Sequence, residues 1–415
     1  MGAMWKLLSP EAPGHPDLDE VQESALTAHP GVTVVLGGPG TGKSAMLVEL
    51  VARRVLAGTP LGRIAVLAGS RAAAQQLRRA IVGRVGRAQT QPVVTTVHGL
   101  ALGLLRDAAP RDERPWTLLR APQQEERIRD LLQHPRVRWP EGLRPARGTR
   151  GVARQRRELL ARIRQRSWDE EQLADLAEQR GDETLAAVAD FLDEYLAVGD
   201  LEGSIDYAEL VHRTRIALHD ADVGRAVRAR LDLVVVDDAH DLDPAQTGLL
   251  ADVAELGIPL TALGDPDQVV SGFRGATAQG LLQLAERPGA RTVQLEDSHR
   301  HGRAVAAAVE ALRRRLPTVG AARALRAARD VAGEVSVRLH RSHADEQAAV
   351  ADELRRAVSD GARWSDLAVC VRAGRAQLVP WTRALLRMGI PVEVAAEELV
   401  IAEDPAAALL LDVLA

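Results

Sequence analysis

The chain has 415 residues, of which 46% are hydrophobic and 27% charged, and its formal net charge is −4. This length predicts roughly two or three domains with their own cores, and the composition is typical of a soluble globular protein. The sequence has neither an apolar run approaching the roughly 18 residues of a membrane span nor a signal-peptide pattern, so we expect a cytoplasmic protein without a membrane partner. Cys370 is the single cysteine, which excludes a disulfide framework and a cysteine zinc site, and its apolar neighbours predict a core position.

Residues 31 to 100 alternate short β-branched runs with helical patterns. The run VTVVLGG precedes a glycine-rich loop and a helix, IAVLAGS precedes RAAAQQLRRAIV, and PVVTTVHG precedes LALGLLRDA. Nearly continuous apolar strands that alternate with helices are typical of a parallel sheet covered on both faces. The sequence therefore predicts that an α/β domain begins here.

Strand patterns stop between residues 101 and 204, where charged helical patterns such as QQEERIRDLL and DETLAAVADFLDEYLAV follow one another. They return at LDLVVVDD and IPLTALGD, which indicates a helical insertion in one α/β domain. From about residue 290 a second α/β pattern begins, with EVSVRLH, DLAVCVR and IPVEVAA as its expected strands. The final stretch, DPAAALLLDVLA, has no capping signal and no closing strand, so we expect this second domain to be incomplete.

Residues 37 to 44, GGPGTGKS, match the pattern G-x-x-x-x-G-K-[ST] between an expected strand and an expected helix. Glycines allow positive φ and let backbone N–H groups face phosphate oxygens, and a helix N-terminus favours an anion. Lys43 is one of only two lysines, because 51 of the 53 basic residues are arginine. A compact ammonium fits a narrow loop better than a planar guanidinium does. We expect Lys43 to reach the β- and γ-phosphates of a nucleotide and Ser44 to bind Mg²⁺.

The segment LVVVDDAHDLDP, residues 233 to 244, is an apolar strand that ends in paired carboxylates. The carboxyl edge of a parallel sheet borders the ligand crevice in such folds. We expect Asp237 to hold Mg²⁺ through water and Asp238 to orient the attacking water. Two acids at a strand end also occur in ordinary turns, and it is the glycine-rich loop earlier in the chain that favours a catalytic site.

Residues 144 to 166, RPARGTRGVARQRRELLARIRQR, contain nine arginines and a single acid, Glu158. Such a segment can follow a polyphosphate backbone, or it can be the solvated face of a helix. The charge pattern alone leaves both interpretations open.

Six short motifs follow one another along the chain. They are LDEVQ (18 to 22), GGPGTGKS, TVHG (96 to 99), VVDDAHDLDPAQ, GDPDQVVSGFRGA (264 to 276) and LEDSHR (295 to 300). In this order they resemble the superfamily 1 helicases of the UvrD/Rep type, over almost the whole chain. The segment RPARGTRGVARQRRELL is similar to the AdnA-type motor subunit of bacterial AdnAB helicase–nucleases.

The resemblance implies a P-loop NTPase with two RecA-like parallel-sheet lobes. Lobe 1A would comprise residues 1–100 and 205–289, an all-helical insertion 1B residues 101–204, and an incomplete lobe 2A residues 290–415. The implied activity is 3′-to-5′ translocation on single-stranded DNA with ATP and Mg²⁺, as a helicase that acts in double-strand break repair. The implied partners are single-stranded or duplex DNA and a second, AdnB-like subunit. Neither the later motifs of the family nor the nuclease module is found in these residues.

Individual roles also follow from the resemblance. Gln22 corresponds to the residue that reads adenine and His299 to the one that stacks on it. Gln268 corresponds to the γ-phosphate sensor, and Arg300 to the second-lobe arginine that reaches the same phosphate. The phosphate-binding loop corresponds to Gly38, Gly40, Thr41, Gly42, Lys43 and Ser44.

For DNA, the resemblance places Thr96 and His98 at the backbone and Phe273, with Arg274 beside it, between bases. A base–aromatic stack contributes roughly 1–3 kcal/mol. Without the motif order, Phe273 would be interpreted as a core residue and Arg300 as one surface arginine among many.

Five positions differ from the family pattern. Asp238 replaces a glutamate that is one methylene longer, His240 replaces a glutamine, Ser271 and His299 stand where tyrosine is common, and Gly69 stands where an aromatic residue is usual. A second hypothesis is therefore a catalytically weak subunit that binds ATP and DNA for assembly. A third, a P-loop kinase or similar transferase, is disfavoured by GDPDQ and by the second α/β pattern.

Overall fold

The computed structural model describes residues 17–86, 93–108, 116–133, 136–141, 150–317, 320, 324–372 and 375–394. The chain divides into two compact units, Met1–Glu334 and Val335–Ala415. None of the described helices is long and apolar enough to cross a membrane.

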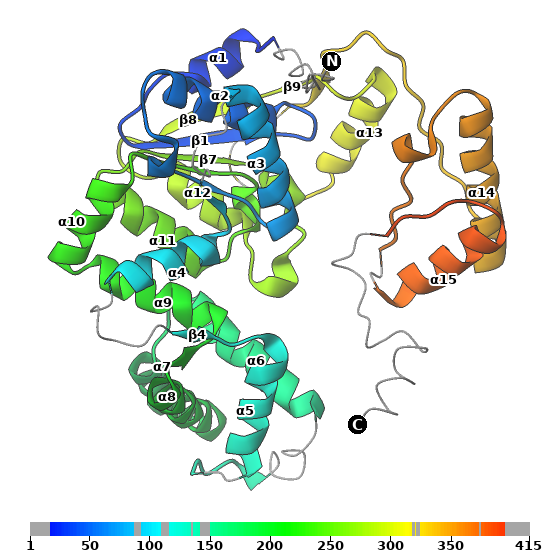
Figure 1. Cartoon of the computed structure of the whole chain (residues 1–415). Coiled ribbons are helices and arrows are strands. Elements are labelled where there is room, and N and C mark those ends of the chain that lie inside the picture. Colours follow the sequence, from blue (N-terminus) through cyan, green and yellow to red (C-terminus); the bar gives the residue numbers. More distant parts are fainter. Residues whose placement is uncertain are drawn as a thin grey trace, which may run out of the picture. The chain divides into compact units, whose positions relative to one another are not determined.

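A six-stranded parallel sheet forms the centre of the first unit (Figure 1). Its strand order is β3-β2-β6-β7-β1-β8. The strands are β1 (Val32–Gly37), β2 (Ile64–Leu67), β3 (Val93–Thr95), β6 (Leu233–Val236), β7 (Leu260–Gly264) and β8 (Arg291–Leu295). Side chains alternate between the two faces, so that Val34 and Leu36 enter one core and Val35 enters the other. This arrangement confirms the predicted α/β fold.

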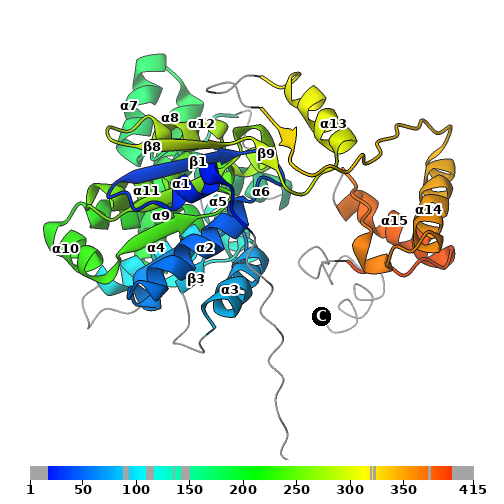
Figure 2. The same cartoon turned by 90° about the horizontal axis from the view of Figure 1, so that it is seen from above.

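Helices cover both faces of this sheet (Figure 2). One layer consists of α1 (Glu20–Leu26), α2 (Lys43–Leu56) and α3 (Arg71–Val85). The other consists of α4 (Val97–Ala108), α9 (Tyr207–Leu218), α10 (Ala221–Arg230), α11 (Pro244–Glu255) and α12 (Ala278–Ala285). Because every connection between parallel strands crosses over, all the strand ends that carry the motifs meet at one edge of the sheet.

In its described residues the insertion has four α-helices, with a core around Trp139 and Phe191. They are α5 (Ala121–Gln133), α6 (Arg150–Gln165), α7 (Glu170–Arg180) and α8 (Glu183–Glu202). A short parallel pair, β4 (Thr117–Leu118) with β5 (Ser204–Ile205), closes its base. The expected start at residue 101 is therefore too early, because Leu100, Ala101 and Leu104 of α4 pack into the core beneath the sheet.

Buried polar contacts join the insertion to the sheet layers. Asp206 caps α9 and accepts hydrogen bonds of 3.0 Å from both Gln124 Nε2 and the Tyr195 hydroxyl. Arg164 of α6 forms a buried ion pair of 2.6 Å with Glu209 of α9. Breaking such a pair leaves an uncompensated buried charge, so these contacts fix the direction of α6.

The expected boundary at residue 290 also needs correction. Strand β8 pairs in parallel with β1 and is the edge strand of the first sheet, not the start of a second lobe. The segments after it, β9 (Asp297–Ser298), α13 (Arg303–Arg313) and β10 (Arg326–Ala327), also belong to the first unit.

The second unit contains α14 (His343–Ser359) and α15 (Arg375–Arg387), which pack around Trp381 and Leu385. The strands expected from EVSVRLH, DLAVCVR and IPVEVAA are not formed in the described part of this unit, residues 335–372 and 375–394. An alternating apolar pattern makes a strand only with a partner to complete its hydrogen bonds, and Val337 and Leu339 are 89% and 96% exposed. Cys370 is exposed as well, so its predicted core position is wrong. The final stretch DPAAALLLDVLA lies outside the described residues.

Candidate functional site

The glycine-rich loop connects β1 to α2 and has the conformation that an anion site needs. Gly40 and Gly42 have φ values of +80° and +83°, where residues with a Cβ are strained. The Lys43 ammonium folds back over the loop and donates hydrogen bonds of 2.6 Å and 3.0 Å to the carbonyl oxygens of Gly37 and Gly38. Burial lowers the pKa of Lys43. The loop therefore presents a partly desolvated cation beside glycine backbone whose conformation suits an anion.

Ser44 and Asp237 are in direct contact, although 193 residues separate them. The Ser44 hydroxyl donates a 2.8 Å hydrogen bond to Asp237 Oδ2 at the end of β6. Burial, and then the neighbouring Asp238 carboxylate, raise the pKa of Asp237, and the Ser44 hydroxyl opposes this. No cluster of three or more His, Cys, Asp or Glu side chains in the described chain could hold a metal by itself.

This donor pair fits Mg²⁺, which takes one or two protein oxygens and completes its shell with water and phosphate oxygens. Ser44 and Asp237 would hold the ion, and the ion would supply neutralisation of phosphate charge. A cation bound beside Asp237 would stabilise the ionised form of this buried carboxylate.

Asp238 occupies a left-handed backbone conformation with φ +51°, at the start of the short 3₁₀ turn Ala239–Asp241. Its backbone N–H donates a 3.2 Å hydrogen bond to Asp237 Oδ1. Aspartate and asparagine enter this region more readily than most residues because their short side chains bond locally. The Asp238 side chain makes no capping hydrogen bond to this turn, and a longer glutamate is less favoured in this backbone conformation.

The residues expected at the adenine end of the nucleotide lie beside the same loop. Gln22 is buried and its Nε2 donates a 2.9 Å hydrogen bond to the Thr41 carbonyl oxygen, and a Cβ added at Gly42 would lie 2.5 Å from that nitrogen. The backbone N–H of His299 donates to the Gly40 carbonyl oxygen at 2.9 Å, and its Nε2 lies 3.1 Å from Asp19 Oδ2. A Cβ added at Gly42 would also lie 4.0 Å from the His299 ring, so Gln22 and His299 both border Gly42.

The residues expected at the γ-phosphate end lie on two further segments. A Cβ added at Gly40 would lie 2.9 Å from the Arg300 Cβ, so Arg300 adjoins the loop from within the first unit. Gln268 and Gly38 line a cavity of about 190 Å³, and Gln268 Nε2 donates to Asp265 Oδ2 at 2.9 Å. In this structure the Gln268 amide is therefore oriented by Asp265, which sequence reasoning did not single out.

The acidic turn is bonded to two other motifs. His240 is buried and its Nδ1 accepts a 3.2 Å hydrogen bond from the Asp265 N–H at the end of β7. Asp241 Oδ1 accepts a 3.3 Å hydrogen bond from the Ser271 N–H. Sequence reasoning treated His240 only as a departure and missed Asp241, although a third acid in DDAHD was a visible signal.

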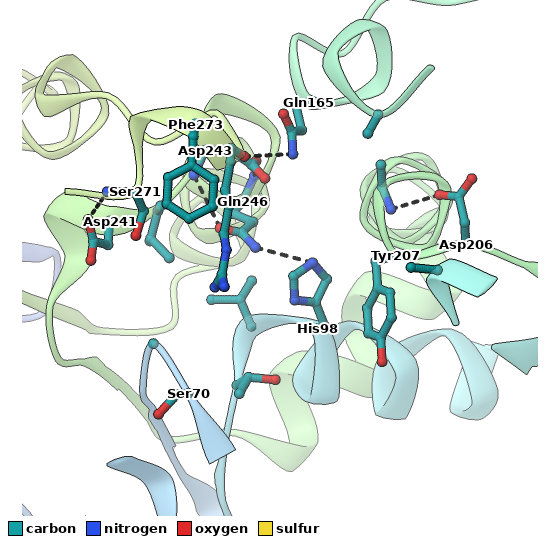
Figure 3. A pocket seen from close by; sticks show the side chains of 18 of the residues that line it. Ser70, His98, Gln165, Asp206, Tyr207, Asp241, Asp243, Gln246, Ser271 and Phe273 are labelled. Atoms are coloured by element: carbon teal, nitrogen blue, oxygen red, sulfur yellow. Dashed lines mark hydrogen bonds between the residues drawn. The ribbon is translucent and has the colours of Figure 1, made fainter. Parts of the chain in front are cut away.

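A cavity of about 930 Å³ lies between the carboxyl edge of the sheet and the insertion (Figure 3). All four residues predicted to contact DNA line it: Thr96, His98, Phe273 and Arg274. Phe273 is 74% exposed, so the alternative that it is a core residue is wrong. The Arg274 guanidinium lies 5.1 Å from the Phe273 ring centroid.

His98 is held on the cavity wall by Tyr207 and Gln246 (Figure 3). The His98 and Tyr207 rings meet edge to face with centroids 5.0 Å apart, and His98 Nε2 is 3.3 Å from Gln246 Nε2. Burial lowers the pKa of His98 to about 4, so the ring is neutral at physiological pH. Thr96 Oγ1 accepts the Gly99 N–H at 3.2 Å, which leaves its hydroxyl proton free to be donated.

The arginine-rich segment forms one wall of this cavity through α6. Arg154, Arg157 and Arg162 line the cavity. Arg154 pairs with Glu158 at 3.1 Å and Arg157 with Glu125 at 3.0 Å. The described part of the segment is therefore partly a solvated helix face, with Arg154 and Arg166 exposed, and partly a wall of the cavity, while Arg164 is buried. Arg144 and Arg147 lie outside the described residues.

A glycine loop that leads into Lys-Ser at the start of a helix, with that serine touching the acid at the end of a neighbouring strand, defines a P-loop NTPase. Residues 18–288 match the family model for the UvrD/REP helicase N-terminal domain. The chain therefore belongs to the UvrD/Rep helicase family.

Three curated relatives illustrate this similarity. Two are from Mycobacterium tuberculosis: ATP-dependent DNA helicase UvrD1, 27% identical over 402 residues (91% of this chain, 49% of the relative), and ATP-dependent DNA helicase UvrD2, 27% identical over 412 residues (91% and 55%). The third is DNA helicase II of Escherichia coli, 28% identical over 307 residues (71% and 40%). The chain spans about half the length of the mycobacterial relatives.

Proposed function

We propose that this chain contains the ATP-hydrolysing core of a DNA helicase that moves along single-stranded DNA. The observation that carries the proposal is the position of Asp238. It follows Asp237, which contacts Ser44 of the phosphate loop, and it also lines the cavity that contains Thr96, His98, Phe273 and Arg274. A single turn therefore borders both a triphosphate site and a site suited to a nucleic acid strand, which is the adjacency that a motor needs.

The proposed roles in hydrolysis follow from this geometry. Lys43 leaves the carbonyls of Gly37 and Gly38 to contact the β- and γ-phosphates, while Ser44 and Asp237 hold Mg²⁺. Asp238 orients the attacking water. Arg300, which is exposed beside Gly40, contacts the γ-phosphate with a guanidinium that stays charged and can bond two oxygens. Gln22 and His299 hold the adenine.

More specifically, we propose that the protein is an AdnA-like motor subunit that translocates 3′ to 5′. It would process DNA ends during double-strand break repair, beside an AdnB-like subunit. The arginine-rich segment that lines the cavity supports this assignment. A full-length protein that unwinds duplexes with 3′ tails, and not those with 5′ tails, supports the polarity. A full-length protein whose DNA-dependent ATPase is unaffected by an AdnB-type subunit contradicts the partnership.

The second candidate is a catalytically weak subunit that binds ATP and DNA for assembly. The short Asp238 carboxylate in a left-handed conformation favours it, because the water has to approach a carboxylate that is set back by one methylene. Single-turnover ATP hydrolysis with and without single-stranded DNA separates the two. The motor proposal expects DNA to stimulate turnover in the wild type and Lys43→Ala to abolish it. No DNA-stimulated turnover, even in the full-length complex, favours the assembly role.

A further inference from the structure

The loop that carries Phe273 is bonded through its backbone to the insertion. Arg162 Nη2 of α6 donates hydrogen bonds of 3.1 Å and 2.6 Å to the carbonyl oxygens of Gly272 and Phe273. Gln165, three residues further along α6, donates from Nε2 to the Arg274 carbonyl oxygen at 2.8 Å (Figure 3). Three consecutive carbonyls of an exposed turn are thus bonded by two side chains from one helix.

The turn fits closely against this helix. Gly275, which ends the turn, has φ +99°, and a Cβ at this position would collide with the Gln165 amide. The same Cβ would lie 3.1 Å from Arg162 Nη1. Only glycine at position 275 allows the turn to pack this closely against α6.

The helix that makes these contacts is itself fixed. Arg164 lies between the two bonding residues and points the other way, into its buried pair with Glu209. Its Nη1 also donates to the Trp168 carbonyl oxygen at 3.1 Å. Movement of α6 would break this buried pair, so Arg162 and Gln165 are presented to the turn from a rigid support.

The opposite side of the turn is bonded to the nucleotide site. The Ser271 N–H donates to Asp241, three residues after Asp238. The Phe273 ring is largely exposed, and the Arg274 guanidinium lies 5.1 Å from its centroid. The backbone that carries the ring is bonded to the ATP-site turn on one side and to the insertion on the other, which fixes the position and direction of the Phe273 Cα–Cβ bond.

We propose that Arg162 and Gln165 are positioning residues that hold the Phe273 ring in the orientation that stacks on a base of single-stranded DNA. This inference rests on the proposed DNA-binding function of the cavity and deepens it. Arg162 acts through backbone carbonyls rather than as a phosphate contact, and the insertion forms part of the stacking site. A preorganised aromatic ring binds more tightly because less rotational freedom is lost on binding.

The test is the affinity of the chain for a fluorescent oligo(dT), measured by anisotropy across a range of salt concentrations. Arg162→Ala and Gln165→Ala each weaken binding about tenfold, as expected when the side-chain hydrogen bonds that hold this exposed turn are lost. The slope of log affinity against log salt stays at its wild-type value, because no phosphate contact is removed. The matched control is Arg154→Ala on the same helix, which also lines the cavity but pairs with Glu158 and not with the turn, so it leaves tryptic cleavage after Arg274 at the wild-type rate.

Two further measurements separate positioning from a structural defect. In a Phe273→Ala background, Arg162→Ala has no additional effect on affinity, because the ring it positions is absent. Without DNA, Gln165→Ala accelerates tryptic cleavage after Arg274, which is exposed in this turn, while the unfolding temperature is retained. An Arg162→Ala variant that lowers the salt slope by about one, or that weakens binding equally in the Phe273→Ala background, overturns the inference. If the wild-type chain does not bind oligo(dT), the proposed DNA-binding function of the cavity is wrong, which is a different result from the loss of the positioning role alone.

Discussion

The Nδ1 atom of His240 accepts a hydrogen bond of 3.2 Å from the backbone N–H of Asp265, and so joins the acidic turn to the strand end that orients Gln268. The acidic turn follows β6 and Asp265 follows β7, and these two strands are neighbours in the sheet. His240 lies close to the end of β7, since a Cβ added at Gly264 would lie 3.1 Å from its Nδ1 atom. Two hydrogen bonds therefore link the turn that contains Asp237 and Asp238 to the Gln268 amide, and we expect the two to move together.

His240→Ala is expected to reduce the stimulation of ATP hydrolysis by DNA. The buried Asp265 N–H loses its acceptor, which costs about 1–3 kcal/mol, and the orientation of Gln268 is no longer tied to the turn. His240→Gln restores an acceptor of similar reach and recovers part of the stimulation. Turnover with and without oligo(dT) measures the effect, and equal stimulation in His240→Ala and wild type contradicts this role.

Asp238→Asn and Asp238→Glu separate carboxylate chemistry from backbone conformation. Asparagine tolerates the left-handed conformation as well as aspartate does, so Asp238→Asn keeps its stability and lowers single-turnover hydrolysis by about 10²-fold. Glutamate brings the carboxylate one methylene closer to the water, and we expect faster hydrolysis with a stability loss of about 1 kcal/mol. Hydrolysis that is indifferent to Asp238→Asn rules out Asp238 as the residue that orients the water.

Phe273→Ala is expected to weaken binding of single-stranded DNA by about 5- to 150-fold, the range for one base–aromatic stack. Phe273→Leu, which keeps an apolar side chain without a π-face, weakens it nearly as much. The salt dependence of binding is unchanged in both variants, because no phosphate contact is lost. Wild-type affinity in Phe273→Leu would show that the residue acts by apolar contact alone.

Asp243 provides a pH-dependent contribution to stability at the floor of the cavity. Burial raises its pKa from 3.8 to about 6. The backbone N–H groups of Gln246 and Ala245 and the charge of Arg162 lower the pKa and so oppose part of this increase. Because the folded pKa is raised, the protein favours the protonated form, and this contribution is present below about pH 4 and is lost as the pH rises through about 6. Asp243→Asn keeps the helix cap and cannot ionise.

The free energy of unfolding of the wild type should therefore fall relative to Asp243→Asn between about pH 4 and pH 7, by on the order of 2–3 kcal/mol. Urea unfolding of both proteins at several pH values measures the difference. A difference that is constant across this range shows that Asp243 ionises in the folded protein as it does in the unfolded chain.

The contact between Ser44 and Asp237 could be anticipated from the sequence because it depends on general geometry. In a parallel sheet the carboxyl ends of all strands lie at one edge, so a glycine loop after one strand and an acid pair after another have to meet there. The same argument brings Thr96, after β3, and Asp265, after β7, to that edge.

Other features depend on packing that sequence patterns do not encode. The acceptors bonded by Arg162 are backbone carbonyls, which every residue has, so nothing in the sequence distinguishes them. The expected boundary at residue 290 places residues 291–295 in a second lobe, because nothing in the sequence reveals that β8 pairs with β1. The expected strands of the second unit failed for the related reason that alternation predicts an exposed and a buried face but not the presence of a neighbouring strand.

The central claim is that Ser44 and Asp237 hold one Mg²⁺ ion for a bound nucleotide. The most direct measurement is the affinity of the chain for a non-hydrolysable ATP analogue, in Mg²⁺ and in EDTA, for the wild type and for Asp237→Asn. Removal of Mg²⁺ is expected to weaken binding at least about tenfold in the wild type and to have little effect in Asp237→Asn, which has already lost the ionic ligand. An equal Mg²⁺ dependence in the two proteins would contradict the claim, because the metal would then be held elsewhere.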